Sequence, residues 1–155
     1  MPILIDIQRA DTSEKIPSDA SINRWVESAL DNNDDSVELS IRVVGEQESA
    51  ALNLQYRGKS GATNVLSFPF SAVTPEPLPM LGDLVVCAPI VTLEAQQQHK
   101  ALEAHWAHMI VHGVLHLVGY DHENDNDARV MEILETEILL GLNYPAPYTE
   151  TTEHN

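Results

Sequence analysis

The stretch His105-Trp-Ala-His-Met-Ile-Val-His-Gly-Val-Leu-His-Leu-Val-Gly-Tyr-Asp-His122 decides how the rest of the chain is organised. Its first four histidines are spaced three, four and four residues apart, so they fall on one stripe of an α-helix. The apolar residues lie on the opposite arc: Ala107, Ile110, Val111, Val114, Leu115 and Val118. The pattern predicts a helix over about residues 103–118 that buries its apolar side and turns its histidines toward a cavity or cleft.

Two of these histidines, with a third beyond the helix, form a pattern typical of metal ligands. His112 and His116 lie one turn apart, so both imidazoles can reach one ion at about 2.0–2.1 Å. Gly119 stands where a helix commonly ends in a left-handed residue, and the chain can turn back there to bring His122 to the same ion. A straight stripe beginning at His108 would span about 12 Å, too far for one ion. We therefore expect His112, His116 and His122 to bind the metal and His108 to line the cavity.

This ligand set favours a catalytic zinc ion over a structural one. Three neutral nitrogens leave zinc a fourth position for water, whose pKa can fall to about 7. Structural sites usually have four ligands, often cysteines, and the chain has one cysteine, Cys87, although a distant fourth ligand stays an alternative. In metzincin proteases a general-base glutamate follows the first histidine; Gly113 stands there instead, which makes a metalloprotease the less favoured hydrolase.

The rest of the sequence predicts a small α+β domain around this helix. Apolar alternation and short apolar runs indicate four strands, at residues 3–8, 37–44, 65–68 and 84–88. Helical spacing indicates four further helices: one from Ser18 or Ser21 to Leu30, and others at about 46–56, 89–99 and 125–140, the last ended by Gly141. We expect a mixed four-stranded sheet with about five helices in one catalytic domain, residues 1–144, and a flexible tail at 145–155.

Composition places the chain among folded proteins of the cytoplasm. Hydrophobic residues make up 43% of it and charged residues 21%. No run approaches the roughly 20 apolar residues of a membrane helix. The short apolar run Ile3–Ile5 is not preceded by the basic residues that begin a secretory signal. A single cysteine cannot form an internal disulfide and fits a reducing compartment. We therefore expect no membrane partner.

The motifs of the chain resemble one bacterial family, the YbeY family. The resemblance lies in residues 112–122 with Tyr56-Arg57-Gly58, Thr63-Asn-Val-Leu-Ser-Phe-Pro69 and Leu81-Gly-Asp-Leu84, and it covers roughly residues 36–144. It implies a single-strand-specific, metal-dependent endoribonuclease that matures ribosomal RNA, especially the 3′ end of 16S rRNA, and supports ribosome quality control. It implies zinc ligands at His112, His116 and His122 and a functionally essential arginine at Arg57, with RNA rather than DNA as the substrate.

Arg57 also suits this chemistry in its own right, because a guanidinium fork can bind two phosphate oxygens and stabilise developing negative charge. Lys59 is better explained as a surface lysine than as a guide for phosphate. Asp121, between the bend and the third ligand, is a turn residue that could also orient a ligand or accept a proton from water. Three further positions are given no catalytic role: Asn64, Ser67 and Asp83.

The charge of the chain opposes tight binding of free RNA. The 24 acidic residues against 8 basic ones give a net charge of −16 with neutral histidines. We expect weak affinity for isolated RNA, with targeting by ribosomal proteins or other ribosome-associated factors. The competing interpretation is a zinc-stabilised assembly factor that binds ribosome components without cleaving them.

Overall fold

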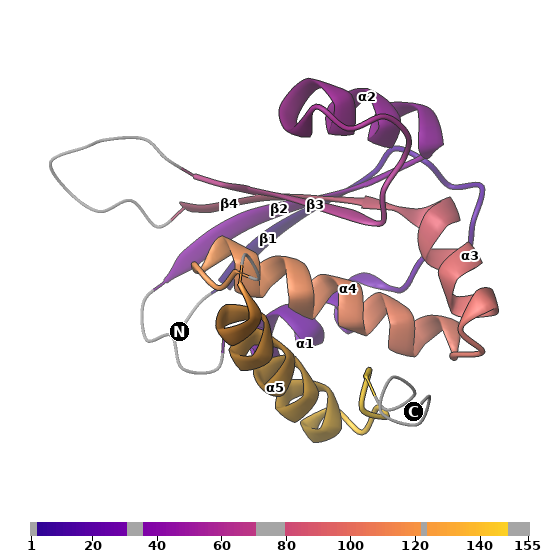
Figure 1. Cartoon of the computed structure of the whole chain (residues 1–155). Helices are drawn as coiled ribbons and strands as arrows, with labels where there is room; N and C mark the ends of the chain where they lie inside the picture. Colours follow the sequence, from indigo (N-terminus) through magenta and orange to yellow (C-terminus); the bar gives the residue numbers. More distant parts are fainter. Residues whose placement is uncertain (1–2, 31–35, 71–79, 122–123, 149–155) are drawn as a thin grey trace, which may run out of the picture.

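The computed structural model describes residues 3–30, 36–70, 80–121 and 124–148. These residues form one α+β domain with five helices and a four-stranded mixed sheet, which confirms the expected fold class (Figure 1). The elements, in chain order, are β1 (Ile3–Arg9), α1 (Asp19–Ala29), β2 (Val37–Val44), α2 (Glu46–Arg57), β3 (Val65–Pro69), β4 (Met80–Cys87), α3 (Ala88–Gln97), α4 (Leu102–Leu117) and α5 (Asp125–Gly141). None of the helices in these ranges has the length and hydrophobicity of a membrane span.

The strand order is β1-β2-β4-β3. Strands β1, β2 and β4 run parallel to one another, whereas β3 is antiparallel to β4 and forms one edge of the sheet. Helix α2 covers one face, and α1 and α4 cover the other (Figure 1). Both faces are therefore buried, which explains the continuous apolar run at the end of β4: Leu84 and Val86 join the main core, and Val85 and Cys87 join the smaller core beneath α2.

Strand β4 begins earlier than its predicted start at residue 84 and ends one residue before its predicted end. Gly82, with φ +140°, interrupts the apolar pattern, and a Cβ there would lie 2.2 Å from the carbonyl oxygen of Phe68 on β3. The pairing of β2 with β4 also shifts register between Glu38 and Leu39. Gly82 allows β3 and β4 to approach closely, and because it has no side chain it breaks the apolar pattern from which the start of β4 is predicted.

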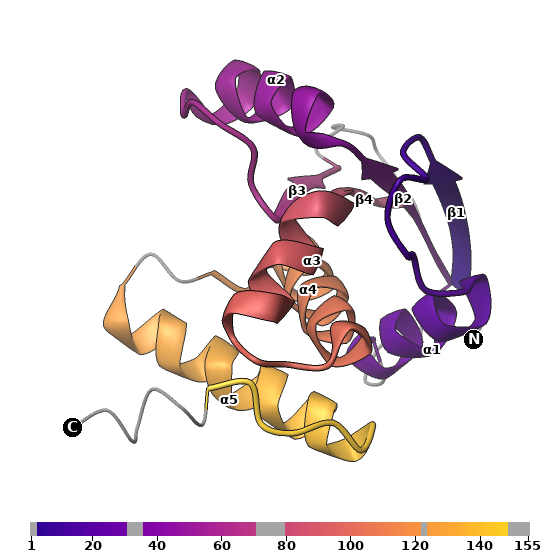
Figure 2. The same ribbon diagram turned by 90° about the vertical axis from the view of Figure 1, so that its right-hand side faces the viewer.

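Helix α4 is buried on almost every side, not on one apolar arc as its pattern predicts. It packs against β3, β4, α1, α3 and α5, and α5 lies on its side away from the sheet (Figure 2). His105 and His108 are 2% and 7% exposed. The prediction that His108 lines the cavity is wrong, because the sequence of α4 alone does not reveal that other helices cover this part of its histidine stripe.

Two helix ends can be compared with their predicted positions. Ser18 caps α1, and its hydroxyl oxygen accepts a hydrogen bond from the backbone N–H of Ser21 at 3.2 Å. Helix α5 ends at Gly141, as predicted, but the residue with a left-handed backbone beyond that end is Asn143, with φ +71°, and not the glycine. Beyond it, Lys100 Nζ donates to the carbonyl oxygen of Pro147 at 3.2 Å.

Candidate active site

The site begins at the C-terminal end of α4, where the chain turns back. Gly119 has φ +109°. The backbone N–H of Tyr120 donates to the carbonyl oxygen of Leu115 at 3.0 Å, and that of Gly119 donates to the carbonyl oxygen of His116 at 3.1 Å. This pair of bonds is a Schellman motif, so the predicted bend at Gly119 is confirmed. The predicted third ligand, His122, lies outside the described residues.

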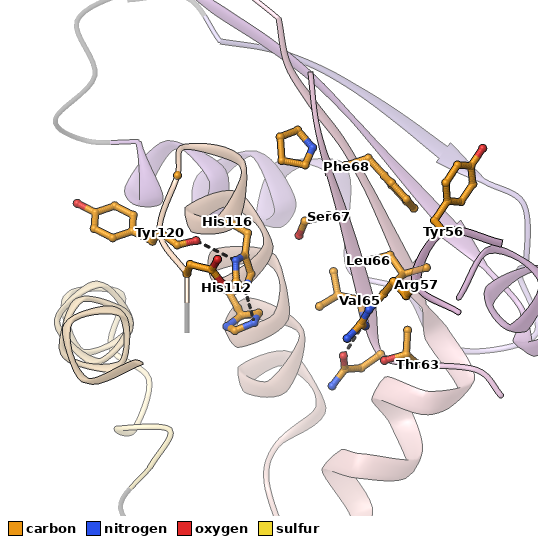
Figure 3. Close-up of a pocket in the computed structure, with 14 residues that line it drawn as sticks. Tyr56, Arg57, Thr63, Val65, Leu66, Ser67, Phe68, His112, His116 and Tyr120 are labelled. Atoms are coloured by element: carbon orange, nitrogen blue, oxygen red, sulfur yellow. Dashed lines mark hydrogen bonds between the residues drawn. The ribbon is translucent and has the colours of Figure 1, made fainter. Parts of the chain in front are cut away.

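His112 and His116 meet on the cleft side of this helix end. Their Nε2 atoms are 3.2 Å apart, and their rings cross at 83° with centroids separated by 4.6 Å (Figure 3). Two nitrogens bound to one tetrahedral ion at 2.0–2.1 Å lie about 3.3 Å apart. The two imidazoles therefore already have the spacing of a ligand pair.

Hydrogen bonds at the opposite ring nitrogens fix which nitrogen carries the proton. His116 Nδ1 lies 2.9 Å from the carbonyl oxygen of Tyr120, and His112 Nδ1 lies 2.6 Å from Glu135 Oε2. Burial would raise the pKa of Glu135, but hydrogen bonds from His108 and His112 outweigh it and lower the pKa to about 2. Both oxygens are acceptors, so these two hydrogen bonds favour the tautomer of each imidazole with its proton on Nδ1. The two Nε2 lone pairs then face each other, an arrangement that a cation stabilises.

A second group of side chains could also hold a metal ion. Ligand atoms of His108, His112 and Glu135 lie within 4.8 Å of one another. Glu135 is 0% exposed, and its Oε1 accepts from His108 Nε2 at 2.9 Å and from the hydroxyl of Tyr148. Burial lowers the pKa of His108, so this imidazole is neutral. The two groups share His112, whose Nε2 faces His116 and whose Nδ1 faces Glu135.

A cleft of about 790 Å³ opens beside the histidine pair. Its walls are the end of α2, the residues leading into β3, strand β3, and the end of α4 with the following turn. The lining residues are Tyr56, Arg57, Thr63, Asn64, Val65, Leu66, Ser67, Phe68, Pro69, His112, His116, Gly119, Tyr120 and Asp121. In Figure 3, Arg57 lies across the cleft from His112 and His116.

The other residues considered from the sequence divide into two groups. Asn64, Ser67 and Asp121 line the cleft. Asn64 donates to Glu94 at 3.2 Å, which ties the floor of the cleft to α3. Lys59 and Asp83 are not among the lining residues. The carboxylate of Asp83 accepts a hydrogen bond at 2.5 Å from the hydroxyl of Ser40, which lies on β2.

Gly113 follows His112 at the position where metzincin proteases carry a general-base glutamate. A Cβ at this position would lie 2.8 Å and 3.1 Å from the two terminal carbons of Leu84. Leu84 is fully buried, so a glutamate here would drive into the sheet and not into the cleft. The side of the helix that bears the base in metzincin proteases is filled by β4.

Glu135 and the tyrosines of the cleft are site residues that the sequence pattern did not predict. Met131, Glu135 and Leu139 are the buried residues of α5 and recur every four positions. An acid within an apolar helical stripe is a signal that could have identified Glu135, since buried carboxylates usually have a partner. Tyr56 and Tyr120 carried no such signal, because exposed tyrosines are common.

The chain is similar to a known protein family and to a solved structure. A family model described as endoribonuclease YbeY matches residues 6–143. The solution structure of TM1509 from Thermotoga maritima is similar, with a TM-score of 0.61 and 25% sequence identity, covering 97% of this chain and 93% of that one.

Proposed function

Because the chain belongs to the YbeY family of endoribonucleases, we propose that it is a zinc-dependent enzyme that cleaves single-stranded ribosomal RNA in the cleft beside α4. The observation that carries this proposal is the facing pair of Nε2 atoms on His112 and His116, 3.2 Å apart in the cleft that Arg57 also lines. Family membership makes the chain a nuclease and a hydrolase. The metal, the RNA specificity and the residue roles are argued below.

We assign the ion to His112 and His116, with His122 as the third ligand. The first two are supported by the spacing of their Nε2 atoms and by the oxygen acceptors that face their Nδ1 atoms. His122 is supported by its sequence position three residues after Gly119. Zinc is the metal proposed, because neutral imidazoles in a tetrahedral arrangement suit it. Bound there, the ion would supply Lewis acidity toward water and toward a phosphate oxygen.

Arg57 is proposed to bind the scissile phosphate and to balance the negative charge that develops during cleavage. Within the described ranges, no carboxylate lies within salt-bridge distance of its guanidinium, whereas Arg9 and Arg42 pair with Asp19 and Glu48 at 2.6 Å. As the last residue of α2, Arg57 also stands at the negative end of the helix dipole. Its charge is therefore available to an anionic ligand in the cleft.

Two tyrosines among the residues that line the cleft have exposed side chains, which supports a preference for single strands. Tyr56 is 59% and Tyr120 is 39% exposed, and both line the cleft. Tyr56 packs edge-on against Phe68, with ring centroids 5.2 Å apart, which leaves much of its ring accessible. Unpaired bases can stack on such rings, whereas a duplex keeps its base faces covered.

The proposed substrate within the cell is ribosomal RNA, including the 3′ end of 16S rRNA. This part of the proposal rests on the family resemblance and on the charge of the chain, −16, which disfavours capture of free RNA. Ribosomal proteins or other ribosome-associated factors would then hold the RNA near the cleft. A cytoplasmic location fits this role and the single buried thiol of Cys87.

The test compares cleavage of a single-stranded RNA and the same sequence as a duplex by zinc-loaded protein. We expect cleavage of the single strand only, with His116→Ala and Arg57→Ala each reducing the rate by about 100-fold or more. Arg129→Ala is the matched control, because this exposed arginine lies on α5 outside the cleft, and its rate should stay within about twofold.

Undiminished cleavage by either cleft variant would contradict its assigned role. A native protein that binds zinc and RNA but cleaves neither RNA would instead be a zinc-stabilised assembly factor.

A further inference from the structure

Glu135 is a fully buried carboxylate behind His112, and it takes no direct part in the cleavage proposed above. It lies on α5, with 0% exposure, and it does not line the cleft. Its carboxylate has three hydrogen-bonding partners: His108 and His112 from α4, and Tyr148 from the segment after α5. A buried carboxylate is costly unless its partners satisfy it, so this arrangement calls for a physical explanation.

We propose that Glu135 is a positioning residue that holds His112 ready for metal binding. Glu135 Oε2 accepts the Nδ1 proton of His112 at 2.6 Å, which leaves the lone pair of this imidazole on Nε2. The same bond fixes the ring orientation, so that Nε2 stands 3.2 Å from Nε2 of His116. A carboxylate behind a ligand histidine also makes its other nitrogen a stronger donor to a metal.

The remaining partners hold the carboxylate itself in place. Glu135 Oε1 accepts from His108 Nε2 at 2.9 Å and from the hydroxyl of Tyr148. With Oε1 occupied by these two donors, Oε2 is directed at His112. Two helices and the segment that follows α5 therefore meet at one carboxylate, and His108 acts through Glu135 and does not bind the ion.

The distances distinguish this role from direct ligation by Glu135. Two atoms bound to one tetrahedral ion at 2.0–2.1 Å lie about 3.3 Å apart, whereas Glu135 Oε2 and His112 Nδ1 are 2.6 Å apart. That separation is typical of a charge-assisted hydrogen bond. An ion on Nδ1 of His112 would also need the proton moved to Nε2, facing His116.

The first measurement is nitrogen NMR of histidine in the metal-free full-length protein. This inference rests on the proposed metal site, but the readout requires neither zinc nor RNA. We expect the native His112 to carry its proton on Nδ1, and Glu135→Gln to show a mixture of both tautomers, because the amide accepts more weakly and can also donate. A native His112 protonated mainly on Nε2 would overturn the inference, even if the variant fails to fold.

The second measurement is the affinity for Zn²⁺, determined by competition with a chelator. Glu135→Gln should weaken binding by about 10- to 100-fold. Glu137→Gln, the same change at an exposed position of α5, should stay within about twofold. Tyr148→Phe removes a donor to Oε1 but leaves the bond to His112, so its effect should be smaller than that of Glu135→Gln.

His116→Ala separates the possible outcomes. Weakened zinc binding in this variant with unchanged binding in Glu135→Gln would overturn the positioning role alone. Unchanged binding in His116→Ala would overturn the proposed metal site, and it is also the result that direct ligation by Glu135 with His108 predicts.

Discussion

At the scale of single residues, neighbours determine which histidines of α4 are suited to chemistry. His105 and His108 are buried, and each forms a hydrogen bond with a carboxylate from a neighbouring helix. His112 and His116 stand one and two turns further along, where the helix reaches the cleft. All four residues are histidines on one stripe of the helix, so the difference lies in what covers each ring.

A prediction at this scale concerns base stacking on Tyr56. Tyr56→Ala should weaken binding of single-stranded RNA about 10-fold, since stacking of one base contributes about 1–3 kcal/mol. Tyr56→Phe keeps the ring and should bind as the native protein does. Michaelis constants for both variants test this; equal constants for the alanine and phenylalanine variants would show that no base stacks at this position.

At the scale of secondary-structure elements, the end of α4 carries the turn toward the third predicted ligand. Gly119 has φ +109°, a backbone angle that residues other than glycine rarely adopt. A Cβ at this position would meet no atom within 4 Å. Any cost of a substitution therefore comes from the backbone and not from crowding.

Gly119→Ala should accordingly lower the free energy of unfolding by about 1–2 kcal/mol. Gly141→Ala is its matched control, because a Cβ there also meets nothing within 4 Å and this glycine, the last residue of α5, has a backbone that alanine adopts readily. Its stability should be unchanged or higher. Denaturant unfolding checks both, and equal stabilities of the two variants would rule out strain at Gly119.

The elements also show how far sequence reasoning reaches. Periodicity located all the helices and strands of the described ranges, because their apolar residues follow the burial pattern. It placed the start of β4 too late, since Gly82 breaks the pattern where two strands approach closely. It predicted His112, His116 and Arg57 from local spacing and resemblance, but Glu135 is brought to His112 by the packing of α5 on α4, which no local pattern records.

At the scale of the whole molecule, the negative net charge limits the electrostatic contribution to RNA binding. A net charge of −16 repels a polyanion, and Arg57 is the one lysine or arginine among the residues that line the described cleft. The affinity for RNA must then come from a few local contacts, and the release of counterions from phosphates contributes little to it.

The salt dependence of RNA binding should therefore be shallow. With one or two phosphates neutralised, the logarithm of the binding constant should fall against the logarithm of salt concentration with a slope of about −0.7 to −1.4. A titration of a short single-stranded RNA measures this slope. A slope several times steeper, with tight binding at low salt, would indicate an extended basic track and contradict the account.

The proposed function requires one metal ion bound by the Nε2 atoms of His112 and His116. Anomalous diffraction at the zinc absorption edge, from crystals of the zinc-loaded protein, locates that ion directly. We predict one peak at about 2.0–2.1 Å from both Nε2 atoms, with Glu135 still hydrogen-bonded to Nδ1 of His112. A peak at bonding distance from Glu135 and His108, and not from His116, would contradict the proposed metal site.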